Sequence, residues 1–269
     1  MTTFAVLGGT GKVGRRLTRI LTTNQHDARP VSRSTPIRFD WRDESTWPAA
    51  LERAEGVFIV GPGSATDWSS TLARFLKVAG AAGVQRAVLL SARGVEFAPD
   101  GVVAAAESAL RAGSLDWTIL RPTHFAQNFT EAMFVPVDGR IVVPVGEAAH
   151  PFLDVEDLAE VAAVVLAGGE YGGQVLELSG PEAITFAAAA EALAGRTGES
   201  AVFVSEGAED HVARLRAAGT PEGYISWRMA MLNGIRSGAD AYVSDGVAEV
   251  LGRPATPFGV WAAREAGTA

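Results

Sequence analysis

The stretch Phe4-Ala5-Val6-Leu7-Gly8-Gly9-Thr10-Gly11-Lys12-Val13-Gly14 decides the fold. Its first four residues are apolar and have the length of a buried strand. Over residues 13–21 apolar side chains recur at helical spacing, with arginines on the other face of the expected helix. A glycine-rich turn between a strand and a helix is typical of dinucleotide-binding folds, because the amino end of the helix attracts the pyrophosphate.

Each glycine of this turn has a physical role. The pattern is Gly9-x-Gly11-x-x-Gly14, and read from one residue earlier it is also Gly8-x-x-Gly11-x-x-Gly14. The early glycines permit the tight turn, Gly11 lets the backbone approach the pyrophosphate, and Gly14 lets the helix lie close to the sheet. The alternative is a glycine turn that merely joins strand to helix. We predict that the whole turn binds cofactor: Gly8, Gly9, Thr10, Gly11, Lys12, Val13 and Gly14.

Beyond this turn, short apolar runs alternate with amphipathic stretches. Further strands are expected at 29–32, 37–39, 57–60, 87–90, 117–120 and 175–178. This alternation predicts an α/β protein with a doubly wound parallel sheet of the Rossmann type, covered on both faces. The rhythm breaks over residues 123–150 and 181–269, which are expected to form a small, mostly helical substrate lobe at the carboxyl edge of the sheet, with one short strand at 202–204. Residues 1–122 and 151–180 would then form the Rossmann domain.

The residues about 20 positions beyond the turn indicate which dinucleotide fits. NAD-binding chains place an acid there, which accepts a hydrogen bond from the ribose 2′-hydroxyl. This chain has Val31-Ser32-Arg33-Ser34 instead. Ser32 offers a hydroxyl and Arg33 a forked cation for a 2′-phosphate, so the sequence predicts NADP(H) as the cofactor. A surface arginine that follows a strand is the alternative interpretation of Arg33.

Further cofactor contacts are predicted where the expected strands end. Asp40 has two interpretations, an acceptor for the adenine amino group or a solvated acid of a loop. The predicted contacts are Asp40, Trp41, Gly61, Pro62, Ser91, Ala92, Pro122, Thr123 and Phe125.

Composition and charge exclude several classes of function. The net charge of −8 at pH 7 lacks the basic footprint of a nucleic-acid partner. The 269 residues include no cysteine, which excludes disulfides, thiolate catalysis and cysteine-ligated zinc and fits a reducing compartment. We find neither a signal-peptide pattern nor an apolar run long enough for a bilayer. We therefore expect a cytoplasmic protein with no membrane partner; no motif indicates its oligomeric state.

The sequence lacks the Tyr-x-x-x-Lys pair with which many Rossmann oxidoreductases transfer a proton. The residues four positions after Tyr171, Tyr224 and Tyr242 are Val175, Arg228 and Gly246. Hydride addition to a ketone creates an alkoxide that needs a proton, whereas addition to an iminium cation gives a neutral amine. The sequence therefore favours an acceptor of the C=N⁺ type, or no reduction at all.

Two residues are candidates for catalysis. Ser91 ends an expected strand, and its alternative role is a cap of that strand. His124 lies at the switch into the lobe, where a histidine either donates a proton or is simply packed. Predicted substrate contacts are Phe125, Asn128, Phe129, Phe152 and Trp227, although aromatic residues in such a lobe also build cores. The histidines have no metal-ligand spacing, so no metal site is predicted.

Three segments, residues 8–14, 89–92 and 117–129, give the sequence a family resemblance. They resemble the atypical short-chain dehydrogenases/reductases of the NmrA-like group. Within that group the chain is most similar to the ergot-alkaloid branch of festuclavine and agroclavine dehydrogenases. Further matches lie at 31–34, 39–41, 151–159, 178–182 and 252–254, so the resemblance covers nearly the whole chain.

The resemblance implies an NADPH-dependent reductase of small molecules in secondary metabolism, acting on cyclic imines, iminium ions or conjugated carbonyls. This branch tolerates loss of the tyrosine–lysine pair. One departure is Val103, because many relatives carry a lysine four residues before the glutamate that here is Glu107, which puts a lysine role in doubt. Two other functions stay open, a dinucleotide-sensing regulator without turnover and a cofactor-dependent isomerase or cyclase.

Overall fold

The computed structural model describes residues 2–63, 66–197 and 201–266. Its centre is a parallel six-stranded sheet in the order β2-β1-β3-β4-β5-β8. The strands are β1 (Thr3–Leu7), β2 (Asp27–Val31), β3 (Gly56–Ile59), β4 (Arg86–Leu90), β5 (Asp116–Pro122) and β8 (Gln174–Leu178). The chain leaves β1 toward β2 and then crosses to β3, so the topological switch lies between β1 and β3. The predicted doubly wound Rossmann fold is confirmed.

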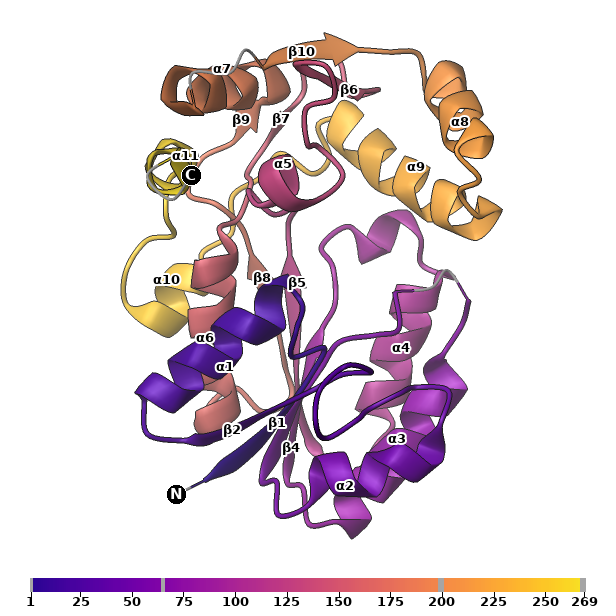
Figure 1. Ribbon diagram of the computed structural model, residues 1–269, viewed down its shortest axis with the longest axis vertical. Helices are drawn as coiled ribbons and strands as arrows, with labels where there is room; N and C mark the ends of the chain where they lie inside the picture. Colours follow the sequence, from indigo (N-terminus) through magenta and orange to yellow (C-terminus); the bar gives the residue numbers. More distant parts are fainter. Residues whose placement is uncertain (1, 64–65, 198–200, 267–269) are drawn as a thin grey trace.

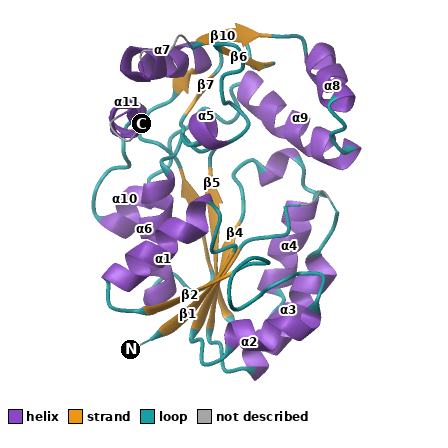
Figure 2. Ribbon diagram, viewed as in Figure 1, coloured by secondary structure: helices purple, strands orange, loops and turns teal. Residues whose placement is uncertain are grey.

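Helices cover both faces of this sheet (Figures 1 and 2). One face carries α1 (Lys12–Thr23), α6 (Val155–Ala167) and α10 (Gly246–Leu251), and the other α2 (Trp47–Leu51), α3 (Ser69–Ala81) and α4 (Val102–Arg111). Alternate side chains of each strand supply the two cores. Phe4 and Val6 of β1 pack toward α1 and α6, while Ala5 and Leu7 pack toward α2 and α3.

A lobe lies over the carboxyl ends of the strands (Figure 1). It contains α5 (Asn128–Glu131), β6 (Arg140–Val143), β7 (Ala149–His150), β9 (Ile184–Thr185), α7 (Phe186–Thr197), β10 (Val202–Ser205), α8 (Ala208–Ala217), α9 (Glu222–Arg236) and α11 (Phe258–Ala266). Strands β6 and β10 pair with each other, as do β7 and β9, and of these four the sequence predicted β10 alone. None of the helices within the described ranges is long and apolar enough to cross a membrane.

The chain returns from the lobe to the Rossmann sheet near residue 242. Tyr242 donates its hydroxyl to Glu177 Oε2 over 2.7 Å, and Ser244 donates to the Glu177 carbonyl over 2.9 Å. Helix α10 then packs on α6, with Val247 in the same core as Phe4. The predicted domain boundaries stay a prediction. They assign α10 to the lobe, but α10 packs on the Rossmann core.

One expected strand is wrong, and a short helix was missed. Residues 37–39 lie in a loop, joined to the edge of the sheet by an isolated bridge between Ser32 and Arg38. The Thr35 hydroxyl accepts the Ser32 N–H over 2.7 Å and donates to the Ile37 carbonyl over 2.8 Å. This side chain therefore satisfies backbone groups that a strand would otherwise pair. Helix α2, close beyond this loop, was not predicted.

The close approach of α1 to the glycine turn predicts the effect of Gly14→Ala. A Cβ at Gly14 would lie 2.3 Å from the Gly8 carbonyl oxygen, so the helix must move away from the turn. We expect the free energy of unfolding to fall by about 1–3 kcal/mol, as for other overpacked interiors, in denaturant titrations. The control is Gly259→Ala in α11, where a Cβ meets open space and alanine favours the helix. Equal stability of the two variants would contradict the close packing.

Candidate functional site

The glycine turn is shaped by contacts that leave no room for side chains. Gly8 has φ +68°, in the left-handed region, and a Cβ at Gly9 would lie 2.5 Å from Pro30 Cβ. The Gly9 N–H donates to the Val31 carbonyl over 3.1 Å, and Gly11 precedes α1 as its N-cap. Thr10 and Gly11 are exposed at the amino end of α1. The turn therefore fits the pyrophosphate of a dinucleotide, which residues 8–14 would hold.

Lys12 connects this turn to the lobe. Its Nζ donates to Asn128 Oδ1 over 3.0 Å, across 116 residues of sequence. Burial lowers the pKa of Lys12, against an opposing effect of Glu131. Asn128, predicted to contact substrate, thus has its amide oxygen held by the cofactor turn, although its side chain still lines the cavity described below.

The residues predicted to hold the ribose and adenine lie beyond β2. Arg33 is exposed, and the Ser32 hydroxyl accepts the Ser34 N–H over 3.2 Å. Both oxygens of Asp40 have partners, the Arg42 N–H at 3.0 Å and Arg38 at 3.2 Å. The bond from the Arg42 N–H is the main cause that lowers the pKa of Asp40. These contacts favour the loop-acid interpretation of Asp40.

Trp41 and Gly61 lie together beside β3. The Trp41 Nε1 donates to the Val60 carbonyl over 3.0 Å, and its ring meets that of Trp68 edge-on at 5.0 Å. A Cβ at Gly61 would lie 2.8 Å from Trp68. Trp41 therefore supports the wall of the cavity from behind Trp68, and Gly61 lines that cavity while Pro62 is exposed.

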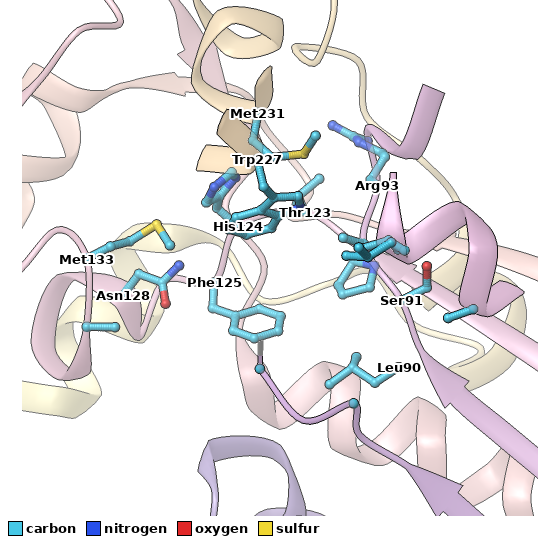
Figure 3. Close-up of a pocket in the computed structure, with 18 of the residues that line it drawn as sticks. Leu90, Ser91, Arg93, Thr123, His124, Phe125, Asn128, Met133, Trp227 and Met231 are labelled. Atoms are coloured by element: carbon cyan, nitrogen blue, oxygen red, sulfur yellow. The ribbon is translucent and has the colours of Figure 1, made fainter. Parts of the chain in front are cut away.

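A cavity of about 480 Å³ opens at the carboxyl ends of β3, β4 and β5. This is the edge at which ligands bind in open α/β sheets. In Figure 3, Leu90 and Ser91 approach from β4, Phe125 from the segment after β5, and Trp227 and Met231 from α9. Predicted site residues that line it are Lys12, Gly61, Ser91, Ala92, Pro122, Thr123, His124, Phe125, Asn128 and Trp227.

Two predicted substrate contacts, Phe129 and Phe152, do not line this cavity. Phe129 and Phe152 are each 1% exposed and stack edge-on at 5.0 Å within the aromatic core of the lobe. The sequence analysis also missed several lining residues, namely Val102, Val103, Met133, Tyr224 and Met231. Tyr224, Trp227 and Met231 recur at helical spacing, so their stripe on α9 was the readable signal.

Ser91 is hydrogen-bonded to a buried carboxylate. Its Oγ donates to Glu107 Oε1 over 2.6 Å, and Glu107 is 1% exposed. Arg121 donates to both oxygens of Glu107, over 2.9 and 2.6 Å, and Arg111 donates to Oε2 over 3.0 Å. Burial by itself would raise the pKa of Glu107, but the bonds from Arg121 and Ser91 outweigh it and lower the pKa. Glu107 is therefore ionised at neutral pH.

His124 is neutral at physiological pH. Burial lowers its pKa to about 4, helped by the positive charges of Arg228 and Arg93. Its ring lies 5.1 Å from that of His150 and 5.6 Å from that of Phe134. A neutral imidazole is a weak acid, so proton donation from His124 would be slow.

The fold also brings His124, His150 and Asp240 within 4.8 Å of one another, although their spacing in the sequence gave no sign of it. His150 Nε2 accepts the backbone N–H of His124 over 3.2 Å, which leaves the proton on Nδ1, 3.4 Å from Asp240. Asp240 is in turn bonded to Arg93 Nε over 2.7 Å. In this tautomer His150 offers no lone pair to a metal, and its buried Nδ1 has no hydrogen-bond partner among the described residues.

Comparison with known proteins places the chain in a family. The model of the NAD(P)H-binding family matches residues 8–168, which include the turn, the cavity strands and α6. The chain belongs to the NAD(P)H-binding family. An uncharacterized oxidoreductase, YesF of Bacillus subtilis, is 31% identical over 272 residues, covering 97% of this chain and 94% of the relative. Festuclavine dehydrogenase of Aspergillus fumigatus is 29% identical over 274 residues, covering 93% of each.

Solved structures show the same fold. The NADPH-dependent quinone oxidoreductase QOR2 of Escherichia coli, complexed with NADPH, superposes with a TM-score of 0.80 at 21% identity, over 98% of this chain and 99% of that one. NmrA, a negative transcriptional regulator, is among the similar structures. The classification as an atypical short-chain dehydrogenase/reductase of the NmrA-like group is confirmed, as is the oxidoreductase class.

The first prediction for this site concerns Arg33, the exposed cation beyond β2. Arg33→Ala should weaken NADPH binding by about 10–100-fold and leave NADH binding nearly unchanged, because a charge-assisted bond to the 2′-phosphate is lost. Fluorescence titration with each cofactor measures this. Lys77→Ala, an exposed cation of α3, is the control for net charge. Equal losses for both cofactors would rule out the 2′-phosphate contact.

The second prediction concerns the imidazole of His124 and the way that stability depends on pH. Because the pKa of His124 is lower in the folded chain than the ordinary 6.5, folded protein binds fewer protons, and stability falls as pH falls from about 6.5 toward 4. Between pH 7 and pH 5 this loss is ~2 kcal/mol. His124→Gln should remove that part of the loss in denaturant titrations at the two pH values. His150 and His211 remain in both proteins, so an identical pH dependence would contradict a buried neutral His124.

Proposed function

We propose that the protein is an NADPH-dependent reductase that transfers hydride to a conjugated acceptor requiring no proton from the protein, with cyclic iminium ions as the leading class. The observation that carries this proposal is the state of the two candidate acids. Ser91 directs its hydrogen to Glu107, and His124 is held neutral by burial. Hydride addition to C=N⁺ yields a neutral amine and oxidised cofactor, a balanced step that consumes no proton.

The residues of the chain have distinct parts in this reaction. The turn at residues 8–14 would hold the pyrophosphate, and Arg33 the 2′-phosphate that distinguishes NADPH. When bound, NADPH supplies the hydride. Phe125, Trp227 and Met231 form apolar walls that exclude water and hold a flat acceptor against the carboxyl ends of β4 and β5.

The relatives support this acceptor class without fixing it. Festuclavine dehydrogenase, similar over 93% of this chain, is named for an alkaloid, and QOR2 is named for quinones. A conjugated carbonyl such as a quinone would leave an anionic oxygen after hydride addition. Its proton would then come from water, from the Lys12 ammonium or from the Tyr224 hydroxyl, because both side chains line the cavity.

The test is a titration of the purified protein with NADPH and NADH, followed by addition of 2-methyl-3,4-dihydroisoquinolinium as a model cyclic iminium. We expect selective NADPH binding and loss of its absorbance at 340 nm once the iminium is present. Binding without oxidation across iminium and enone acceptors would refute the reductase and favour a dinucleotide sensor. A product of the same mass as its substrate would instead favour an isomerase or cyclase.

A further inference from the structure

The bond between Ser91 and Glu107 fixes which atom carries the hydrogen. An ionised carboxylate has no proton to give, so the hydrogen in the 2.6 Å contact belongs to the serine hydroxyl. Arg121 and Arg111 occupy the same carboxylate, which is 1% exposed and cannot turn toward water. A hydroxyl has a single hydrogen, so toward the cavity Ser91 presents lone pairs.

The apolar side chains of the cavity make the direction of the Ser91 hydrogen bond important for recognition of a bound molecule. Leu90, Ala92, Val103, Ala106 and Pro122 line the same cavity as Ser91, and their side chains are all apolar. Val103 and Ala106 lie on α4 close before Glu107, so the helix that carries the carboxylate adds no side-chain donor of its own. At this point of the cavity wall, a bound molecule therefore meets a hydrogen-bond acceptor, the hydroxyl oxygen of Ser91.

We propose that Glu107 is a positioning residue that fixes Ser91 as a hydrogen-bond acceptor, so that the cavity selects substrates with an N–H or O–H donor beside the hydride-accepting carbon. This inference rests on the proposed function and narrows its substrate class. It favours a protonated imine, C=N⁺–H, over an N-alkylated iminium of the same shape and charge. It disfavours a carbonyl oxygen at this point, because lone pairs would face lone pairs.

A matched pair of probes tests the proposal. Protonated 3,4-dihydroisoquinoline carries N–H where 2-methyl-3,4-dihydroisoquinolinium carries N–CH₃, and both have one positive charge. At a pH where the imine is protonated, the wild type should prefer the N–H probe by about tenfold in kcat/KM. Ser91→Ala should bring that ratio close to one while leaving the ion pairs of Glu107 intact.

The variant Glu107→Gln tests whether Glu107 sets the direction of the Ser91 hydroxyl or only supports the structure around it. With its oxygen at the Oε2 position the amide would keep the bonds from Arg121 Nη2 and Arg111, so its NH₂ group would face Ser91 and donate to it. The Ser91 hydrogen would then point into the cavity, and the preference for the N–H probe should fall by about tenfold or reverse. The double variant Ser91→Ala/Glu107→Gln should behave as Ser91→Ala alone. A purely structural role would slow both probes equally and keep their ratio.

A binding measurement keeps this test separate from the reductase hypothesis. Quenching of tryptophan fluorescence, with Trp227 in the cavity wall, gives dissociation constants for the non-reacting cations isoquinolinium and N-methylisoquinolinium. Preference for the N–H cation that disappears in Ser91→Ala would support the proposal even where neither iminium is reduced, an outcome that refutes only the proposed function. The same ratio in wild type and Ser91→Ala, in binding and in turnover, would overturn the role of Ser91 and Glu107.

Discussion

The closeness of α1 to the strands beneath it is the constraint on which the rest of the site depends. Gly9 lies against Pro30 of β2 and Gly14 against the carbonyl of Gly8, at distances that admit no Cβ. This packing aims the amino end of α1 at the carboxyl edge of the sheet. It also sets the position of Lys12, whose bond to Asn128 joins the turn to the lobe. Cofactor turn and cavity are therefore parts of one packed unit.

A second set of contacts holds the lobe over the cavity. Arg93, which follows β4, is buried with Asp240 and donates to the Tyr242 carbonyl over 2.8 Å. Its guanidinium also lies 4.0 Å from the centre of the Tyr242 ring. On the same loop Phe97 packs against Gly234 of α9, where a Cβ would lie 2.3 Å from the ring. The loop after β4 thus fixes α9, and with it Trp227, relative to Ser91.

The sequence predicted the site best where local pattern determines position. Parallel strands end at one edge, so residues that follow them, such as Ser91 and Thr123, were placed correctly beside the cavity. The lobe was harder, because burial there depends on contacts between distant segments. Phe129 looked like a substrate contact but is needed in the core, and the role of Glu107 depends on α4 lying beside Arg121 of β5. The expected strand at 37–39 failed because Thr35 satisfies its backbone locally.

The segment that contacts β8 before it leads into α10 has a consequence for solubility. β8 is the last strand of the sheet, and the open edge of such a strand is a template for pairing with another molecule. The Ser244 hydroxyl bonds to the Glu177 carbonyl on that strand, and Gly246 lies so near the same oxygen that a Cβ would meet it at 2.3 Å. The chain therefore shields its own edge, and intermolecular strand addition there would first have to displace the segment that leads into α10.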